Sequence, residues 1–126
     1  MKVKVKGLDP KLATHFTRFC CEHLPVWPKS IEIFAEDKLV NNKSGLCIDI
    51  DEDNYLILIS KKNKNISQIY TSIAHEMVHV KQFMYDNLGE LLDEGYNYDT
   101  CWWEQEARER SKKILLEFVK KFERKG

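Results

Sequence analysis

The chain has 126 residues, of which 43% are hydrophobic and 32% are charged. This length and composition are typical of one folded globular domain and exclude a disordered chain. The 20 basic and 20 acidic residues balance, which argues against nucleic acid or an anionic membrane as a partner. We therefore expect a single domain over residues 1–126 that binds neither nucleic acid nor a membrane.

The N-terminal residues and the cysteines predict a cytoplasmic protein. The opening sequence MKVKVKGLDP lacks the apolar segment of a secretory signal, and no apolar run approaches the roughly 18 residues of a membrane span. Cys20 and Cys21 are adjacent and cannot easily pair with each other, while Cys47 and Cys101 stand alone. We therefore expect four reduced thiols.

The first predicted elements are a charged strand and a helix. Lysines alternate with valines over residues 2–6, as in an edge strand that charge protects from aggregation. Asp9 and Pro10 are the residue types of a helix N-cap and first helical position, and Pro25 and Pro28 end the helix.

Three strands follow, at residues 31–35, 45–51 and 54–60. The first is short and apolar, the second alternates apolar and polar residues, and the third, NYLILIS, is rich in β-forming residues. The connections are short and contain asparagine, aspartate and glycine. Short connections favour an antiparallel meander.

Two longer helices complete the predicted α+β fold. An apolar stripe at helical spacing predicts a helix over residues 67–86, and residues 100–124 show similar spacing. Residues 87–99 between them are predicted to form a loop or a short turn of helix. This order of elements predicts a small sheet packed against a few helices.

The sequence AHEMVHVKQF, residues 74–83, contains the pattern H-E-x-x-H in His75, Glu76 and His79. Residues four apart on a helix share a face, so that both imidazoles can bind one metal ion. Zn²⁺ accepts histidine nitrogens as ligands, and a glutamate beside the first histidine can take a proton from the attacking water. The pattern predicts zinc as the cofactor and Glu76 as a general base. A histidine pair without a metal is the alternative.

A third ligand must come from another segment, and residues 102–118 offer two glutamates. Glu104 and Glu106 lie about 200° apart on a helix. Glu106 shares a charged face with Arg110, with which it can form a surface ion pair. Glu104 shares a face with buried-type residues and is therefore the better candidate for an inward-facing ligand. The residues on its face are Ala107, Ser111, Leu115, Phe118 and Phe122.

The pair AHEMVHVKQ and WWEQEAR resembles the gluzincin pattern of zinc metallopeptidases, in which a glutamate on a following helix completes an H-E-x-x-H site. It is similar to small metallopeptidase-like proteins of phage and prokaryotic genomes and to minigluzincins. The resemblance covers roughly residues 54–110. It implies His75 and His79 as zinc ligands, Glu104 as the third ligand and Glu76 as the general base.

The resemblance also implies a zincin-like fold, with an antiparallel meander packed on the active-site helix between an N-terminal helix and a C-terminal glutamate-bearing helix. Residues 54–60 are the expected strand beside that helix, and substrate would bind as an added strand. Two positions depart from the family pattern. Trp102 replaces the usual proline, and Arg108 stands where an acidic residue often supports a ligand histidine.

Residues that could stabilise an oxyanion are less clearly indicated. Tyr96, Tyr98 and His23 have suitable side chains, but each of them is more simply a packing residue. The segment 86–99 contains five acidic residues and no basic one, which would suit a basic substrate or simply a solvated loop.

Three functions remain open on the sequence. The first is a zinc-dependent metallopeptidase that acts on a peptide or protein substrate. The second is a non-catalytic, zinc-holding protein-binding module, which a fourth protein ligand such as Cys101 or Asp99 would favour. The third is a metal-free helical interaction domain.

Overall fold

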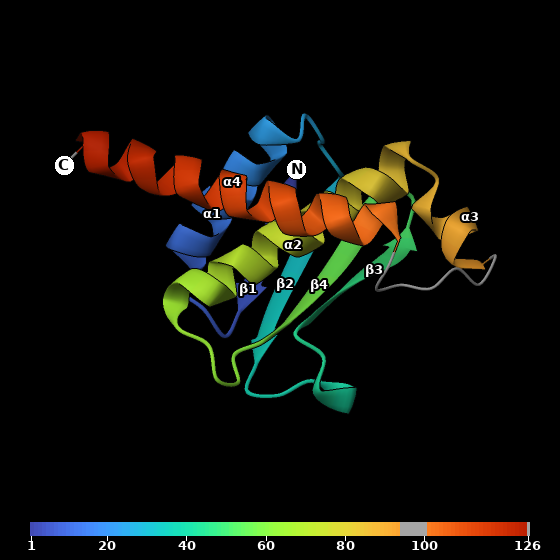
Figure 1. Ribbon diagram of the computed structural model, residues 1–126, viewed down its shortest axis with the longest axis horizontal. Helices are drawn as coiled ribbons and strands as arrows, with labels where there is room; N and C mark the ends of the chain where they lie inside the picture. Colours follow the sequence, from blue (N-terminus) through green and yellow to red (C-terminus); the bar gives the residue numbers. More distant parts are fainter. Residues whose placement is uncertain (94–100, 126) are drawn as a thin grey trace.

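The computed structural model describes residues 1–93 and 101–125, and this part of the chain forms an α+β fold of four strands and four α-helices (Figure 1). The elements in chain order are β1 (Lys2–Lys6), α1 (Pro10–His23), β2 (Ser30–Glu36), the short 3-10 helix η1 (Val40–Asn42), β3 (Gly45–Asp51), β4 (Asn54–Ser60), α2 (Ile66–Tyr85), α3 (Leu88–Asp93) and α4 (Trp102–Lys125).

The sheet has the order β1-β2-β4-β3 and is mixed. Strand β2 is parallel to both of its neighbours, and β3 is antiparallel to β4. The predicted antiparallel meander is therefore wrong, because β4 lies between β2 and β3. Residues 37–44 are long enough to pass the intervening strand, whereas Asp53, with a φ of 61°, makes the tight turn that pairs β3 with β4.

The position of each strand follows from its side chains. Strand β4 carries the apolar sequence NYLILIS and lies inside the sheet, where both of its edges are paired. Strand β1 is an edge strand, as predicted, and its three lysines are exposed. Strand β3 is the other edge, and its last four residues, 48–51, are exposed and include two aspartates. Charged edge strands resist pairing with other chains.

The helices begin at capping residues. The side chain of Asp9 accepts a hydrogen bond from the backbone N–H of Lys11 at 3.3 Å, which confirms the predicted start of α1. Asn65 and Gln68 form a reciprocal capping box at the start of α2. Helix α3 lies within the segment 87–99, for which the sequence predicts a loop or a short turn of helix.

The core lies between one face of the sheet and the helices. Helix α2 crosses that face, and α4 runs beside α2 (Figure 1). Of the adjacent tryptophans, Trp103 is buried and Trp102 is exposed. The four cysteines, all of them described residues, form no disulfide with one another. Within the described residues no helix is long and apolar enough to span a membrane. Buried side chains of the core cluster include Phe16, Ile31, Ile33, Ile57, Ile59, Ile73, Met77 and Phe118.

Candidate metal centre

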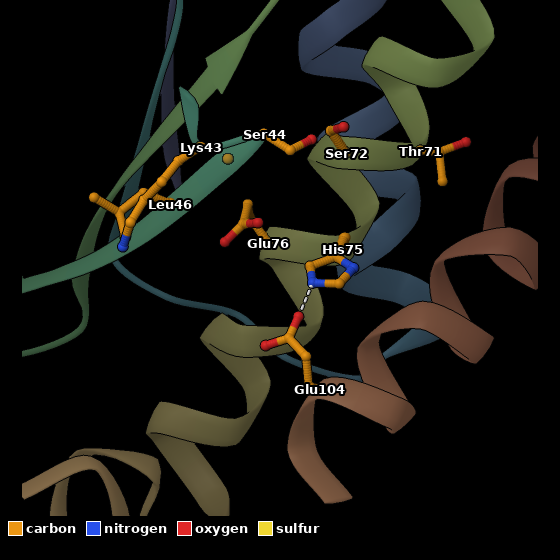
Figure 2. A pocket seen from close by; sticks show the side chains of 9 residues that line it. Lys43, Ser44, Leu46, Thr71, Ser72, His75, Glu76 and Glu104 are labelled. Carbon is orange, nitrogen blue, oxygen red and sulfur yellow. Dashed lines mark hydrogen bonds and ion pairs between the residues drawn. The ribbon is translucent and has the colours of Figure 1, made fainter. Parts of the chain in front are cut away.

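The H-E-x-x-H residues lie in the middle of α2, on the sides that face α4 and β3. His75 and His79 are one helical turn apart, and their ring centroids are 5.0 Å apart. Figure 2 shows His75 directed toward Glu104 of α4 and Glu76 directed toward the start of β3. Glu76 and His79 are only 5% and 1% exposed, respectively. The motif therefore lies in a buried seam between three elements.

Glu104 brings its carboxylate between the two histidines. Its Oε1 lies 2.5 Å from Nε2 of His75, and its Oε2 lies 3.4 Å from Nε2 of His79. One ligand atom from each of these residues lies within 4.8 Å of the other two. Among the described residues, no other group of three or more histidine, cysteine, aspartate or glutamate side chains has its ligand atoms close enough together to hold a metal ion. The structure thus brings together the three ligands that the sequence predicts.

Glu106 lies on another face of α4, as the helical spacing predicted. Its Oε2 is 3.5 Å from the guanidinium of Arg110 and 3.2 Å from Nζ of Lys81. Its Oε1 accepts a hydrogen bond from Nε2 of Gln82 at 2.8 Å. The expected pair with Arg110 is present, but Glu106 also ties α4 to α2. It is a bridging residue and does not reach the ligand group.

Gln82 fixes the orientation of His79. Its amide Nε2 donates to the backbone carbonyl of Trp103 at 2.8 Å and to Glu106. Both partners are acceptors, so the amide oxygen must be the atom that lies 2.7 Å from Nδ1 of His79. Nδ1 therefore carries a proton, and Nε2, when it is unprotonated, presents its lone pair toward Glu104. A hydrogen bond of this kind commonly orients a metal-binding histidine.

His75, His79 and Glu104 could hold a cation. Nε2 of His79 and Oε2 of Glu104 would be two facing acceptors at 3.4 Å, and they repel unless a proton or a metal ion lies near both. Ligands about 2.0–2.1 Å from a tetrahedral zinc are about 3.3 Å from one another. Oε1 of Glu76 and Oε2 of Glu104 are buried, and neither receives a hydrogen bond within the described part of the chain. Two imidazole nitrogens and one carboxylate are a zinc donor set.

The buried charges shift one another's pKa. Burial raises the pKa of Glu104, but its contacts with His75 and His79 outweigh this effect and lower the pKa to about 2. Burial also raises the pKa of Glu76, and the two histidines only partly offset the rise. Burial lowers the pKa of His79, while Glu104, Glu76 and Gln82 raise it above its ordinary value overall. Glu104 is thus a stable carboxylate, and Glu76 is the stronger proton acceptor.

A cavity of about 500 Å³ opens onto this group. Residues 43–46 form one wall and Thr71 and Ser72 another, while His75, Glu76 and Glu104 line its inner part (Figure 2). The sequence predicted residues 54–60 as a strand close to the active-site helix, and β4 does pack against α2. The strand at the edge of the cavity is β3, however, because β4 is an inner strand of the sheet.

Gly45 lets β3 approach Glu76. A Cβ atom at this position would lie 2.9 Å from Oε2 of Glu76 and 3.3 Å from the backbone oxygen of Leu58. A distance below 3.0 Å is one that a real Cβ atom does not tolerate, so any side chain here would displace the carboxylate. Gly45 is not among the site residues that the sequence pattern predicts. The available signal was the glycine at the start of a strand with alternating polarity, because glycine in a strand often marks a place where another group approaches the backbone closely.

The other candidates from the sequence fall outside this site. His23 lies at the end of α1, where its Nδ1 is 3.3 Å from the carbonyl of Phe19 and its ring stacks on the Phe19 ring at 4.2 Å. Tyr96, Tyr98 and Asp99 lie outside the described residues. Cys101 is described but does not belong to the ligand group. Arg108 is exposed. The residue that supports His79 is Gln82, whose amide oxygen accepts a hydrogen bond from Nδ1 of the histidine.

Comparison with known protein families, with curated proteins and with solved structures gave no match. The resemblance to gluzincins therefore stays a prediction that rests on the residues themselves.

Proposed function

We propose that this chain is a zinc-dependent metallopeptidase of gluzincin type with a zincin-like arrangement of sheet, active-site helix and glutamate-bearing helix. The observation that carries the proposal is the convergence of His75, His79 and Glu104, with the carboxylate of Glu76 beside them at the cavity. These three residues would hold the zinc. Within the described residues no fourth protein ligand joins them, and a catalytic zinc needs an open position.

The chemistry divides between the metal and the protein. His75, His79 and Glu104 would hold a zinc ion that would make a bound water more acidic and polarise the substrate carbonyl. Glu76 accepts a proton from the attacking water and transfers it to the departing amine. Its burial and its lack of a hydrogen bond at Oε1 leave that oxygen available for this proton. Gln82 holds the ring of His79 in place while this occurs.

Strand β3 supports substrate binding. As an edge strand, it has backbone N–H and C=O groups that do not pair with β4. A peptide can add to such an edge as a further strand through main-chain hydrogen bonds. Gly45 at the start of β3 lies against Glu76, so a peptide bound along β3 would pass the general base.

The first test is metal content. Elemental analysis of protein purified without chelator should give about one zinc per chain. The zinc should be lost in His79→Ala and retained in His23→Ala, which removes an exposed histidine outside the site. Wild-type protein that folds but contains no zinc and binds none on titration would contradict the proposal and favour the metal-free interaction domain.

The second test separates catalysis from zinc binding. In Glu76→Gln, kcat/KM for a peptide library should fall by about 10²–10⁴-fold, while the zinc content stays unchanged. Glu109→Gln, an exposed glutamate of α4, is the matched control and should stay fully active. Equal activity of Glu76→Gln and wild type would rule out the mechanism. Zinc without any cleavage would identify the alternative, a non-catalytic zinc-holding protein-binding module.

A further inference from the structure

A second cavity, of about 230 Å³, adjoins the candidate metal centre. Lys43 and Ser44 line both cavities, so the two meet just before the start of β3. The second cavity is lined by lysine, asparagine and serine, and no carboxylate among the described residues contributes to it. Its lysines, which we call the lysine cluster, are Lys38, Lys43, Lys62 and Lys64.

Among the described residues, none supplies a carboxylate counter-ion to the lysine cluster. None of its four ammonium groups has a carboxylate within 4.0 Å in the part of the chain that the structure describes. The neighbouring Lys61, in contrast, pairs with Asp37 at 3.9 Å. Four like charges around one small cavity repel one another and produce a positive potential there. An anion bound in the cavity would relieve this repulsion.

Lys64 is the member of the cluster that is fixed in position. Its Nζ donates to the backbone oxygen of Ser44 at 2.8 Å and to the hydroxyl of Ser72 at 3.1 Å. Both acceptors line the cavity of the metal centre, and Figure 2 shows Ser44 and Ser72 facing each other across it. An ammonium has three donors, and no group among the described residues accepts from the third.

Lys64 is also close enough to the centre to interact with Glu76 electrostatically. Burial lowers the pKa of Lys64, and the charge of Glu76 opposes this shift. A partly desolvated ammonium interacts more strongly with an anion than a fully hydrated one does. The cluster therefore has a rigid member at the boundary with the metal centre and three exposed members around it.

The opposite end of β3 has the opposite charge. A cavity of about 390 Å³ there is lined by Asp49, Asp51, Glu52 and Asp53, together with apolar and aromatic residues. The six residue steps from Gly45 to Asp51 span about 20 Å at roughly 3.3 Å per residue. A peptide added along β3 would meet positive charge beside the general base and negative charge well away from it.

We propose that the lysine cluster is a subsite for a carboxylate of the peptide substrate near the scissile bond. The carboxylate is either an acidic side chain or the free C-terminus, since both present the same charged group to the cluster. This inference rests on the proposed peptidase function in so far as the bound peptide is a substrate.

Cleavage kinetics test the subsite. One neutral peptide sequence is prepared with a single glutamate at each position in turn, and each peptide is made with a free and with an amidated C-terminus. Wild type should cleave the preferred carboxylate-bearing peptide about fivefold faster or more, in kcat/KM, than the neutral amide. A preference that follows the glutamate identifies a side-chain carboxylate, and one that follows the free terminus identifies the C-terminal group.

Two exposed members of the cluster are then neutralised. In Lys38→Gln/Lys62→Gln, whose two lysines line the second cavity but not that of the metal centre, the preference should fall to about twofold or less, while cleavage of the neutral amide is unchanged. Lys112→Gln/Lys113→Gln removes the same charge from exposed positions of α4 that line neither cavity, and it should keep the preference. A wild type without preference, or a double variant that retains it, would overturn the inference.

A binding measurement distinguishes failure of the subsite from failure of the peptidase. Fluorescence anisotropy of labelled glutamate-bearing and neutral peptides is measured on Glu76→Gln, with and without the Lys38→Gln/Lys62→Gln changes. Tighter binding of the acidic peptide that depends on the lysines supports the subsite even if no preparation cleaves peptide. Equal binding of both peptides contradicts the subsite even if wild type is an active peptidase.

Discussion

Helix α2 has two buried sides, which are built from different kinds of residue. The side that packs on the sheet is apolar and includes Ile69, Ile73 and Met77. The side that faces α4 carries His79 and Gln82, which meet Glu104 and Glu106. Apolar side chains are stabilised by the area that they bury, whereas each buried polar group needs a partner.

The polar side meets that need except at the cavity. Gln82 is satisfied at both ends of its amide, and Glu106 accepts from α2 and from Arg110. The buried oxygens without a hydrogen bond in the described residues are on Glu76 and Glu104, and both residues line the cavity. Within the described residues, Gln82 and Glu106 therefore have hydrogen-bond partners between α2 and α4. The carboxylate oxygens without one lie at the cavity, where we propose chemistry.

The largest effect should come from the apolar side. Ile73→Ala removes a fully buried side chain and should lower the free energy of unfolding by about 2–5 kcal/mol. Urea denaturation in the presence of a chelator measures this change without a metal contribution. Ile66→Ala, at an exposed position of the same helix, should change it by less than about 0.5 kcal/mol. Similar losses in both variants would contradict the assignment of the two sides.

A smaller effect is expected from changes to the polar side of α2, where Gln82 contacts His79. Gln82→Leu removes the acceptor that orients His79 and should weaken zinc binding about 10–100-fold. Competition against a chromophoric chelator provides the measurement. Gln105→Leu, an exposed glutamine of α4, should bind zinc like wild type. An unchanged affinity in Gln82→Leu would show that packing alone fixes the histidine ring.

The smallest effect on stability is expected for Arg110, which lies at the exposed edge of the polar contacts between α2 and α4. Arg110 lies 3.5 Å from Glu106 and is partly exposed, so Arg110→Ala should cost only about 0.2–0.5 kcal/mol of stability. Lys81 and Gln82 still hold Glu106 in that variant, and zinc affinity should not change. Thermal unfolding and the same chelator competition check both statements. A loss above about 1 kcal/mol would mean that the pair is a structural link of the seam.

Sequence reasoning was most successful where the pattern is local. Helical periodicity located α2 and α4, and the 200° between Glu104 and Glu106 separated the inward residue from the bridging one. Capping residues located the start of α1. These features depend on neighbours within one or two turns of the same helix, which the sequence displays directly.

Sequence reasoning failed where the answer depends on distant pairing. The length of a connection does not say which strand lies beside which, so the insertion of β4 between β2 and β3 was missed. For the same reason the sequence did not show that β3 lies at the edge of the cavity. The role of Gln82 was also out of reach, because its partners Trp103 and Glu106 are more than 20 residues away in the sequence.

The distribution of the candidate ligands over two helices has a consequence for folding. His75 and His79 belong to α2 and Glu104 to α4, so a metal ion held by all three would cross-link segments that are separate in the chain. Such an ion stabilises the folded state in proportion to the logarithm of its free concentration, by about 4 kcal/mol at a thousand times Kd. A chelator would then lower the free energy of unfolding, and the packing of α4 on α2 would depend on the free metal concentration.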